Sequence, residues 1–157
     1  MDYTYGLAMG IHTLAAVVWV GGMFFAHVIL RPVLGELEPA QRLGVWRQVL
    51  PRFFTFVWIS IIGLLATGYG VLLFGFRGGF SGGPSHVDVM QLSGLVMMGL
   101  YVQLFFGPWQ GFKRAFAAGD FPKTAEYQAR IRHIVTINLI LGMLTIFIGT
   151  VGSLLGT

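Results

Sequence analysis

Charged residues and cysteine are what this sequence has least of. Only 10% of the 157 residues are charged, whereas 55% are hydrophobic, and a soluble globular domain has about 25% charged residues. The mean hydropathy is +0.76. This composition excludes a soluble globular domain and indicates an integral membrane protein of one domain, residues 1–157. Because cysteine is absent, disulfides, thiol catalysis, iron–sulfur clusters and cysteine-based zinc sites are excluded.

Acidic residues are missing from the interior of the apolar segments. The nearest, Asp88, lies at the outer end of one of them, so a carboxylate proton relay of the kind found in many pumps is not expected. No HExxH zinc motif and no phosphate-binding loop is present. The formal charge is +4 and the pI is near 9.9. The basic residues flank apolar segments and form no separate domain, so nucleic acid is not an expected partner.

Four apolar segments reach the roughly 20 residues that a helix needs to cross a bilayer. They predict an all-α, four-helix membrane bundle whose main partner is lipid, with Arg31-Pro32 ending the first helix. The expected spanning helices are about residues 5–30, 53–76, 86–106 and 133–155. Apolar residues alternate with polar ones at helical spacing in three further stretches, which predict short amphipathic helices at the interface. These stretches are residues 35–52, 112–118 and 123–132.

The basic residues lie on one side of this expected topology. Nine of the ten Lys and Arg residues follow the first or the third apolar segment, and only Arg77 lies on the other side. Cytoplasmic loops carry such an excess of positive charge. We therefore expect a multi-pass protein of the bacterial inner membrane, with the basic loops and amphipathic helices in the cytoplasm and both termini in the periplasm.

Small residues recur on the second and fourth apolar segments, as they do where helices approach closely in lipid. They are Ser60, Gly63, Thr67 and Gly70 on the second, and Gly142, Gly149 and Gly152 on the fourth. Two amides, Gln103 and Asn138, lie within spanning segments. We expect both to hydrogen-bond a neighbouring helix.

The first apolar segment carries a histidine near each end. The two are fifteen residues apart, or roughly 22 Å of helix rise. Steps of three and four residues place them on one stripe of a helix. The stripe consists of His12, Ala15, Ala16, Trp19, Gly22, Met23, Ala26 and His27. An imidazole within the membrane is costly without a partner, so this stripe is expected to face the bundle.

The four histidines fall at two depths. His12 and His86 belong near the outer surface, and His27 and His133 near the cytoplasmic surface. Haem b takes axial imidazoles from different helices, with small residues and aromatic rings around it. We expect His12 to be the favoured iron ligand with His86 as its partner, and His27 with His133 as a second pair. One or two haems would then serve electron transfer or a membrane redox enzyme, with Trp19 beside the cofactor.

Two alternatives stay open. The first is copper, bound by imidazoles and by the thioethers of Met23, Met90 and Met97, although methionine is also a common core filler. The second is an accessory subunit without a cofactor, which packs through its glycine stripes into a larger complex. A membrane redox partner or a second copy of the chain is a further expected partner.

The sequence resembles two families of bacterial membrane proteins. His12, Trp19, Gly21-Gly22 and Arg31-Pro32 resemble the first helix of the copper resistance D (CopD) domain. The stretches HVDVMQLSGLVMMGLYVQLFFGPW and RIRHIVTINLILGML resemble its third and fourth helices. This resemblance implies copper handling. The His-to-Trp spacing is also similar to the HemJ family of protoporphyrinogen oxidases, whose first-helix histidine is associated with haem b, and this implies a haem role for His12.

Overall fold

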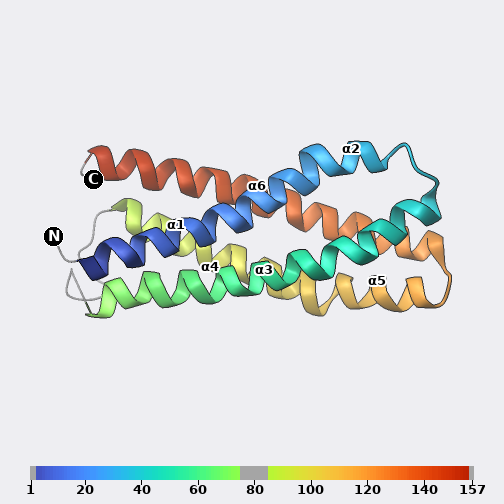
Figure 1. Cartoon of the computed structure of the whole chain (residues 1–157), viewed down its shortest axis with the longest axis horizontal. Helices are drawn as coiled ribbons and strands as arrows, with labels where there is room; N and C mark the ends of the chain where they lie inside the picture. Colours follow the sequence, from blue (N-terminus) through green and yellow to red (C-terminus); the bar gives the residue numbers. More distant parts are fainter. Residues whose placement is uncertain (1–2, 75–84, 156–157) are drawn as a thin grey trace.

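The computed structural model describes residues 3–74 and 85–155, and every element within them is a helix (Figure 1). The helices are α1 (Tyr3–Phe24), η1 (Phe25–Leu30), α2 (Arg31–Leu34), α3 (Pro39–Phe74), α4 (Ser85–Phe106), α5 (Pro108–Ala117) and α6 (Phe121–Leu155). Four helical stretches are long and apolar enough to cross a membrane: Tyr3–Leu34, Pro39–Val71, His86–Ala117 and Phe121–Leu154. The all-α class and the four candidate spans are therefore confirmed.

The first helical stretch continues through Arg31-Pro32, where the sequence predicted its end. The segment η1 is π-helical, and the Arg31 N–H bonds the Ala26 carbonyl five residues earlier. A proline ring inside a regular helix clashes with the preceding turn and leaves a carbonyl without its donor. The wider π turn lies directly before Pro32, so the chain continues in helical conformation to Leu34.

Two of the stretches predicted as separate amphipathic helices belong to longer ones. Most of residues 35–52 form the start of α3, with Pro51 inside the helix, and residues 123–132 form the start of α6. Only α5 is a separate short helix, set off by the non-helical backbone of Gly107. Figure 1 shows α3 and α6 running the whole length of the bundle.

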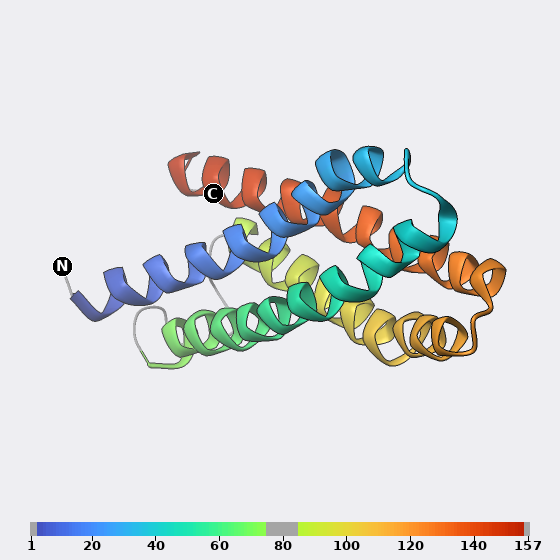
Figure 2. The same ribbon diagram turned by 45° about the vertical axis from the view of Figure 1, so that its right-hand side comes forward.

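The helices pack mainly in pairs, α1 on α3 and α6 on both α4 and α5. The start of α1 and the end of α6 lie at one end of the bundle, whereas α2, α5 and the starts of α3 and α6 lie at the other (Figures 1 and 2). The basic loops of the sequence therefore meet at a single end of the molecule.

The α1 stripe faces the bundle as predicted. All eight of its residues are buried or half-buried, while neighbours such as Leu14 and Val17 are exposed. At its centre Trp19 meets Tyr101 edge-on, with ring centroids 6.2 Å apart. The Tyr101 hydroxyl donates to the Phe54 carbonyl at 3.0 Å, and the two rings also meet edge-on. These rings form the middle of the core.

The glycines of α6 receive side chains of α4. Gly149 lies against Met90 and Gly152 against His86, while Gly142 lies between Met97 and Val20 of α1. Beside them Asn138 donates to the Met97 carbonyl at 3.1 Å, which confirms the interhelical bond predicted for this amide. Gln103 is exposed instead.

A side chain at Gly142 should separate α6 from its neighbours. A Cβ there would lie 2.8 Å from Val20 Cγ2 and 3.1 Å from Met97 Cε, and overpacking of this kind costs about 1–3 kcal/mol. We expect Gly142→Val to lower the unfolding free energy by that amount in an SDS titration of mixed micelles. Gly99→Val is the control, because nothing lies within 4 Å of its Cβ position. Equal stability of the two variants would contradict this packing.

Candidate functional site

His12 is half-buried on α1 and faces α3. Its Nδ1 lies 2.9 Å from the hydroxyl oxygen of Thr67, and that hydroxyl donates to the Gly63 carbonyl at 2.6 Å. When the Thr67 hydroxyl proton is on the Gly63 carbonyl, its oxygen accepts from His12. Nδ1 then carries the imidazole proton and Nε2 keeps its lone pair. This is the tautomer that binds a metal through Nε2, with the second nitrogen held by a neighbour.

Small residues surround the His12 ring. A Cβ at Gly68 would lie 3.3 Å from His12 Cε1, and one at Gly63 would lie 3.6 Å from Ala15 Cβ. The stripe of small residues on α3 therefore allows α1 to pack closely on α3. Trp19 lies two turns further along and is only 2% exposed, where its ring contributes to the core.

The two outer histidines lie against different helices. His86 of α4 packs on α6, where a Cβ at Gly152 would lie 2.6 Å from His86 Cγ. His12 packs on α3. Among the contacts of the described residues, none joins the two imidazoles that the sequence analysis paired.

The two residues of the second predicted pair differ in burial. His27 is half-buried in η1, and its Nδ1 lies 3.5 Å from the Thr136 hydroxyl oxygen, at the limit of a hydrogen bond. The Thr136 hydroxyl also donates to the Arg132 carbonyl at 2.8 Å. His133 lies one turn before Thr136 on α6 and is exposed.

The methionines proposed as copper ligands fill helix contacts. Met23 and Met97 are 2% and 4% exposed and belong to the core. A Cβ at Gly149 would lie 2.6 Å from Met90 Sδ. Within residues 3–74 and 85–155, no three or more His, Asp or Glu side chains gather in a way that could hold a metal ion.

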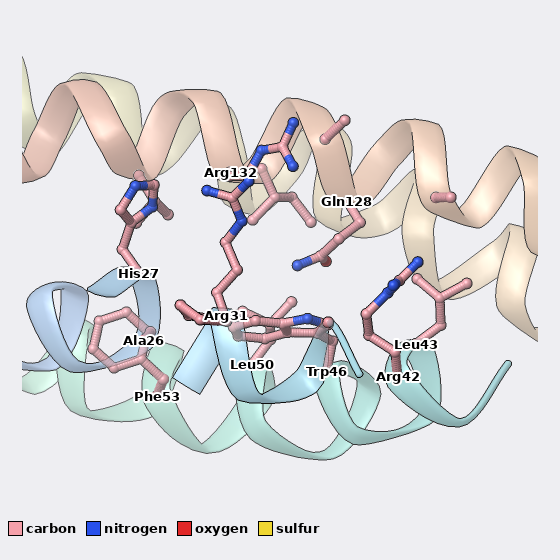
Figure 3. Close-up of a pocket in the computed structure, with 16 residues that line it drawn as sticks. Ala26, His27, Arg31, Arg42, Leu43, Trp46, Leu50, Phe53, Gln128 and Arg132 are labelled. Carbon is pink, nitrogen blue, oxygen red and sulfur yellow. The ribbon is translucent and has the colours of Figure 1, made fainter. Parts of the chain in front are cut away.

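A cavity of about 680 Å³ lies at the basic end of the bundle, between η1, α2, α3 and α6 (Figure 3). Arginines from three helices line it, and the described residues of its wall include no Asp or Glu. Its wall consists of Ala26, His27, Arg31, Pro32, Gly35, Arg42, Leu43, Trp46, Leu50, Phe53, Ala125, Gln128, Ala129, Ile131, Arg132 and Val135.

The polar groups of the cavity have few partners inside the protein. In the described part of the chain, no ion pair or side-chain hydrogen bond engages Arg31, Arg42 or Arg132. The Oε1 atom of Gln128 is buried without a hydrogen-bond partner there. Figure 3 shows Gln128 between Arg132 and Arg42, on the side of the cavity opposite Trp46. A buried polar group without a partner calls for an explanation, such as a ligand or water.

The sequence analysis missed this cavity, because it used the arginines only as markers of topology. One signal was available. Ala125, Gln128, Ala129 and Arg132 recur at steps of three and four, and so form a stripe of small and polar residues on one helix face. The convergence of Arg31 and Arg42 on that stripe depends on the packing of three helices.

The chain is similar in sequence to an uncharacterized protein of Aquifex aeolicus (strain VF5). The two are 26% identical over 151 residues, which cover 95% of each chain. No family model matches the chain, and no solved structure matches it. The comparison carries no function.

The tautomer of His12 can be measured directly. In protein labelled with ¹⁵N-histidine and prepared without cofactor, we expect Nδ1 of His12 to be protonated and Nε2 to be unprotonated, because we expect the Thr67 hydroxyl to donate to the Gly63 carbonyl 2.6 Å away. Thr67→Val removes the hydroxyl and should abolish the preference for a proton on Nδ1 over Nε2. Thr13→Val should leave that preference unchanged, since Thr13 bonds only Met9 of its own helix. Protonated Nε2 in the unmodified chain would contradict the assignment.

Proposed function

We propose that this protein binds haem b in the bacterial inner membrane and acts in electron transfer, with His12 as an axial ligand of the iron. The single observation that carries the proposal is the hydrogen bond between His12 Nδ1 and the Thr67 hydroxyl, which leaves the Nε2 lone pair for a metal when Nδ1 is the donor. An imidazole held in this way within a span is a functional residue by default. The expected haem role of the first-helix histidine, drawn from the HemJ resemblance, agrees with it.

Haem b suits His12 better than a bare metal ion, because a bare ion needs several ligands from the protein. Gly63 and Gly68 allow α3 to pack closely on Ala15 and His12, and within residues 3–74 and 85–155 no group of three or more His, Asp or Glu side chains could hold a metal ion. Haem b brings four nitrogen ligands of its own, so one imidazole suffices for a five-coordinate iron. When bound, it supplies one-electron transfer at the iron. The chain's own contribution is to orient the His12 ring through its hydrogen bond with Thr67.

Copper binding receives less support. The thioethers of Met90 and Met97 pack against glycines of α6, so the soft ligands that a Cu(I) site needs are engaged in helix contacts. A haem protein composed of spanning helices needs a donor and an acceptor of electrons. We therefore propose a second membrane redox protein, or another copy of this chain, as its partner.

Removal of the His12 imidazole should remove haem. We expect protein purified from haem-supplied cells to show Soret and α bands and one or two haems per chain in a pyridine haemochrome assay. His12→Ala should lose the haem of this site. Thr67→Val should weaken its binding by about tenfold or more, as changes behind a metal ligand do.

Thr13→Ala is the matched control, since this exposed neighbour on α1 bonds only its own helix. It should keep the haem content of the unmodified chain. A folded protein without a porphyrin signal would refute haem binding. If His12→Ala binds as much haem as the unmodified chain, a residue other than His12 ligates the iron.

The orientation of the bundle can be tested with the same cysteine-free chain. We expect Tyr3→Cys to react with a membrane-impermeant maleimide added to intact cells, because Tyr3 is 95% exposed at the end we assign to the periplasm. Ala118→Cys, exposed at the basic end, should react only after the membrane is opened. The reverse pattern would overturn the positive-inside assignment.

A further inference from the structure

The arginine-lined cavity combines two kinds of surface. Arg31, Arg42 and Arg132 come from α2, α3 and α6, and Figure 3 shows all three beside the same space. Further along the wall lie apolar side chains, including Leu50, Phe53 and Val135. The cavity thus has guanidinium groups as well as a hydrocarbon surface.

The charges of this cavity are not balanced within the protein. Since no carboxylate lies in the described wall, three cations share one space without an anion. Arg31 and Arg132 are exposed and Arg42 is half-buried, so these cations are accessible to an anionic ligand. Guanidinium forks bind phosphate and carboxylate groups in bidentate fashion. The complementary ligand therefore carries at least one of these anions.

The apolar wall adds a second requirement. A small free anion would bind the arginines but would not contact Phe53, Leu50 or Val135, whose apolar surface would remain in contact with water. An amphiphile places its anionic head among the arginines and its hydrocarbon body along these side chains. The unpartnered Gln128 Oε1 offers such a head one hydrogen-bond acceptor, for a hydroxyl or an ammonium group. Basic pockets between spanning helices bind lipid headgroups in this way.

We propose that this cavity is a binding site for an amphiphile whose anionic group is a phosphate or a carboxylate, held by Arg31, Arg42 and Arg132. Two sources offer this chemistry at the cytoplasmic face. One is an anionic phospholipid, and the other is a tetrapyrrole with two propionates. The inference does not rest on haem at His12, because it uses none of the residues of that site.

The test compares two double variants with the same change in charge. Arg42→Gln/Arg132→Gln removes cations from the cavity, and Arg52→Gln/Arg114→Gln removes two cations of the same end that do not line it. Native mass spectrometry of the full chain in neutral detergent measures binding of added dioleoyl phosphatidylglycerol, and separately of inorganic phosphate. A pyridine haemochrome assay measures porphyrin in the same samples.

We expect the unmodified chain and the control to bind phosphatidylglycerol, or to retain porphyrin, and the cavity variant to weaken that binding by about tenfold or more. Loss of charge-assisted hydrogen bonds has this effect. A change in phosphatidylglycerol alone identifies a phospholipid. A change in porphyrin that spares phosphatidylglycerol identifies a tetrapyrrole. Equal behaviour of the two double variants, or inorganic phosphate binding as tightly as the lipid, would overturn the proposal.

A second variant separates loss of the site from loss of the fold. Ala129→Phe extends a side chain into the cavity while all three arginines remain, so it should also weaken binding. Val102→Phe is the control, because Val102 is exposed on α4 and does not line the cavity. If Ala129→Phe elutes as a monodisperse protein and binds as the unmodified chain does, the ligand does not occupy this cavity. If His12 binds no haem, the measurement of phosphatidylglycerol binding still tests the cavity.

Discussion

The constraint on which this structure depends is that hydrocarbon offers no hydrogen bonds, so polar groups within the spans must bond inside the protein. The backbone meets it by forming helices. The threonines meet it by donating to the carbonyl four residues earlier, as seen at Thr13, Thr55, Thr67, Thr136, Thr145 and Thr150. A threonine whose proton is on that carbonyl offers its oxygen as an acceptor, whereas Thr145 also donates to Ser93 at 2.7 Å. At Thr67, donation to the Gly63 carbonyl would place the His12 proton on Nδ1.

Packing supplies the second part of the explanation. Lipid is as apolar as the side chains, so helices gain little from burying them and associate through close contact instead. In the α4–α6 pair, glycines of α6 receive methionine and histidine side chains of α4. In the α1–α3 pair, Gly63 and Gly68 receive Ala15 and His12. Both helix pairs therefore pack through glycines. The rings of Trp19, Phe54 and Tyr101 join the two pairs at the centre of the bundle.

The two candidate sites offer opposite chemistry at opposite ends of the bundle. At His12 the group is an imidazole nitrogen, a type of ligand that metals take. In the cavity the groups are guanidinium donors without an acceptor in its described wall, a type of group that anions take. The π turn of η1 lies at the second site and places Ala26 and His27 in its wall. Such turns are often found at functional positions, and here the turn also allows the helix to continue through Pro32.

Composition and periodicity were enough to determine the helical class, the four apolar spans and the face that α1 turns inward, because bilayer thickness and helical repeat act locally along the chain. Asn138 was also predictable, since a buried amide in a span needs a partner. The continuous α3, with Pro51 inside it, and the helix through Pro32 were not, because a proline usually ends a helix. The partner of His12 lies 55 residues away, and the three cavity arginines meet from three helices. Only the tertiary structure could decide these contacts, because they depend on how rigid helices rotate and tilt against one another.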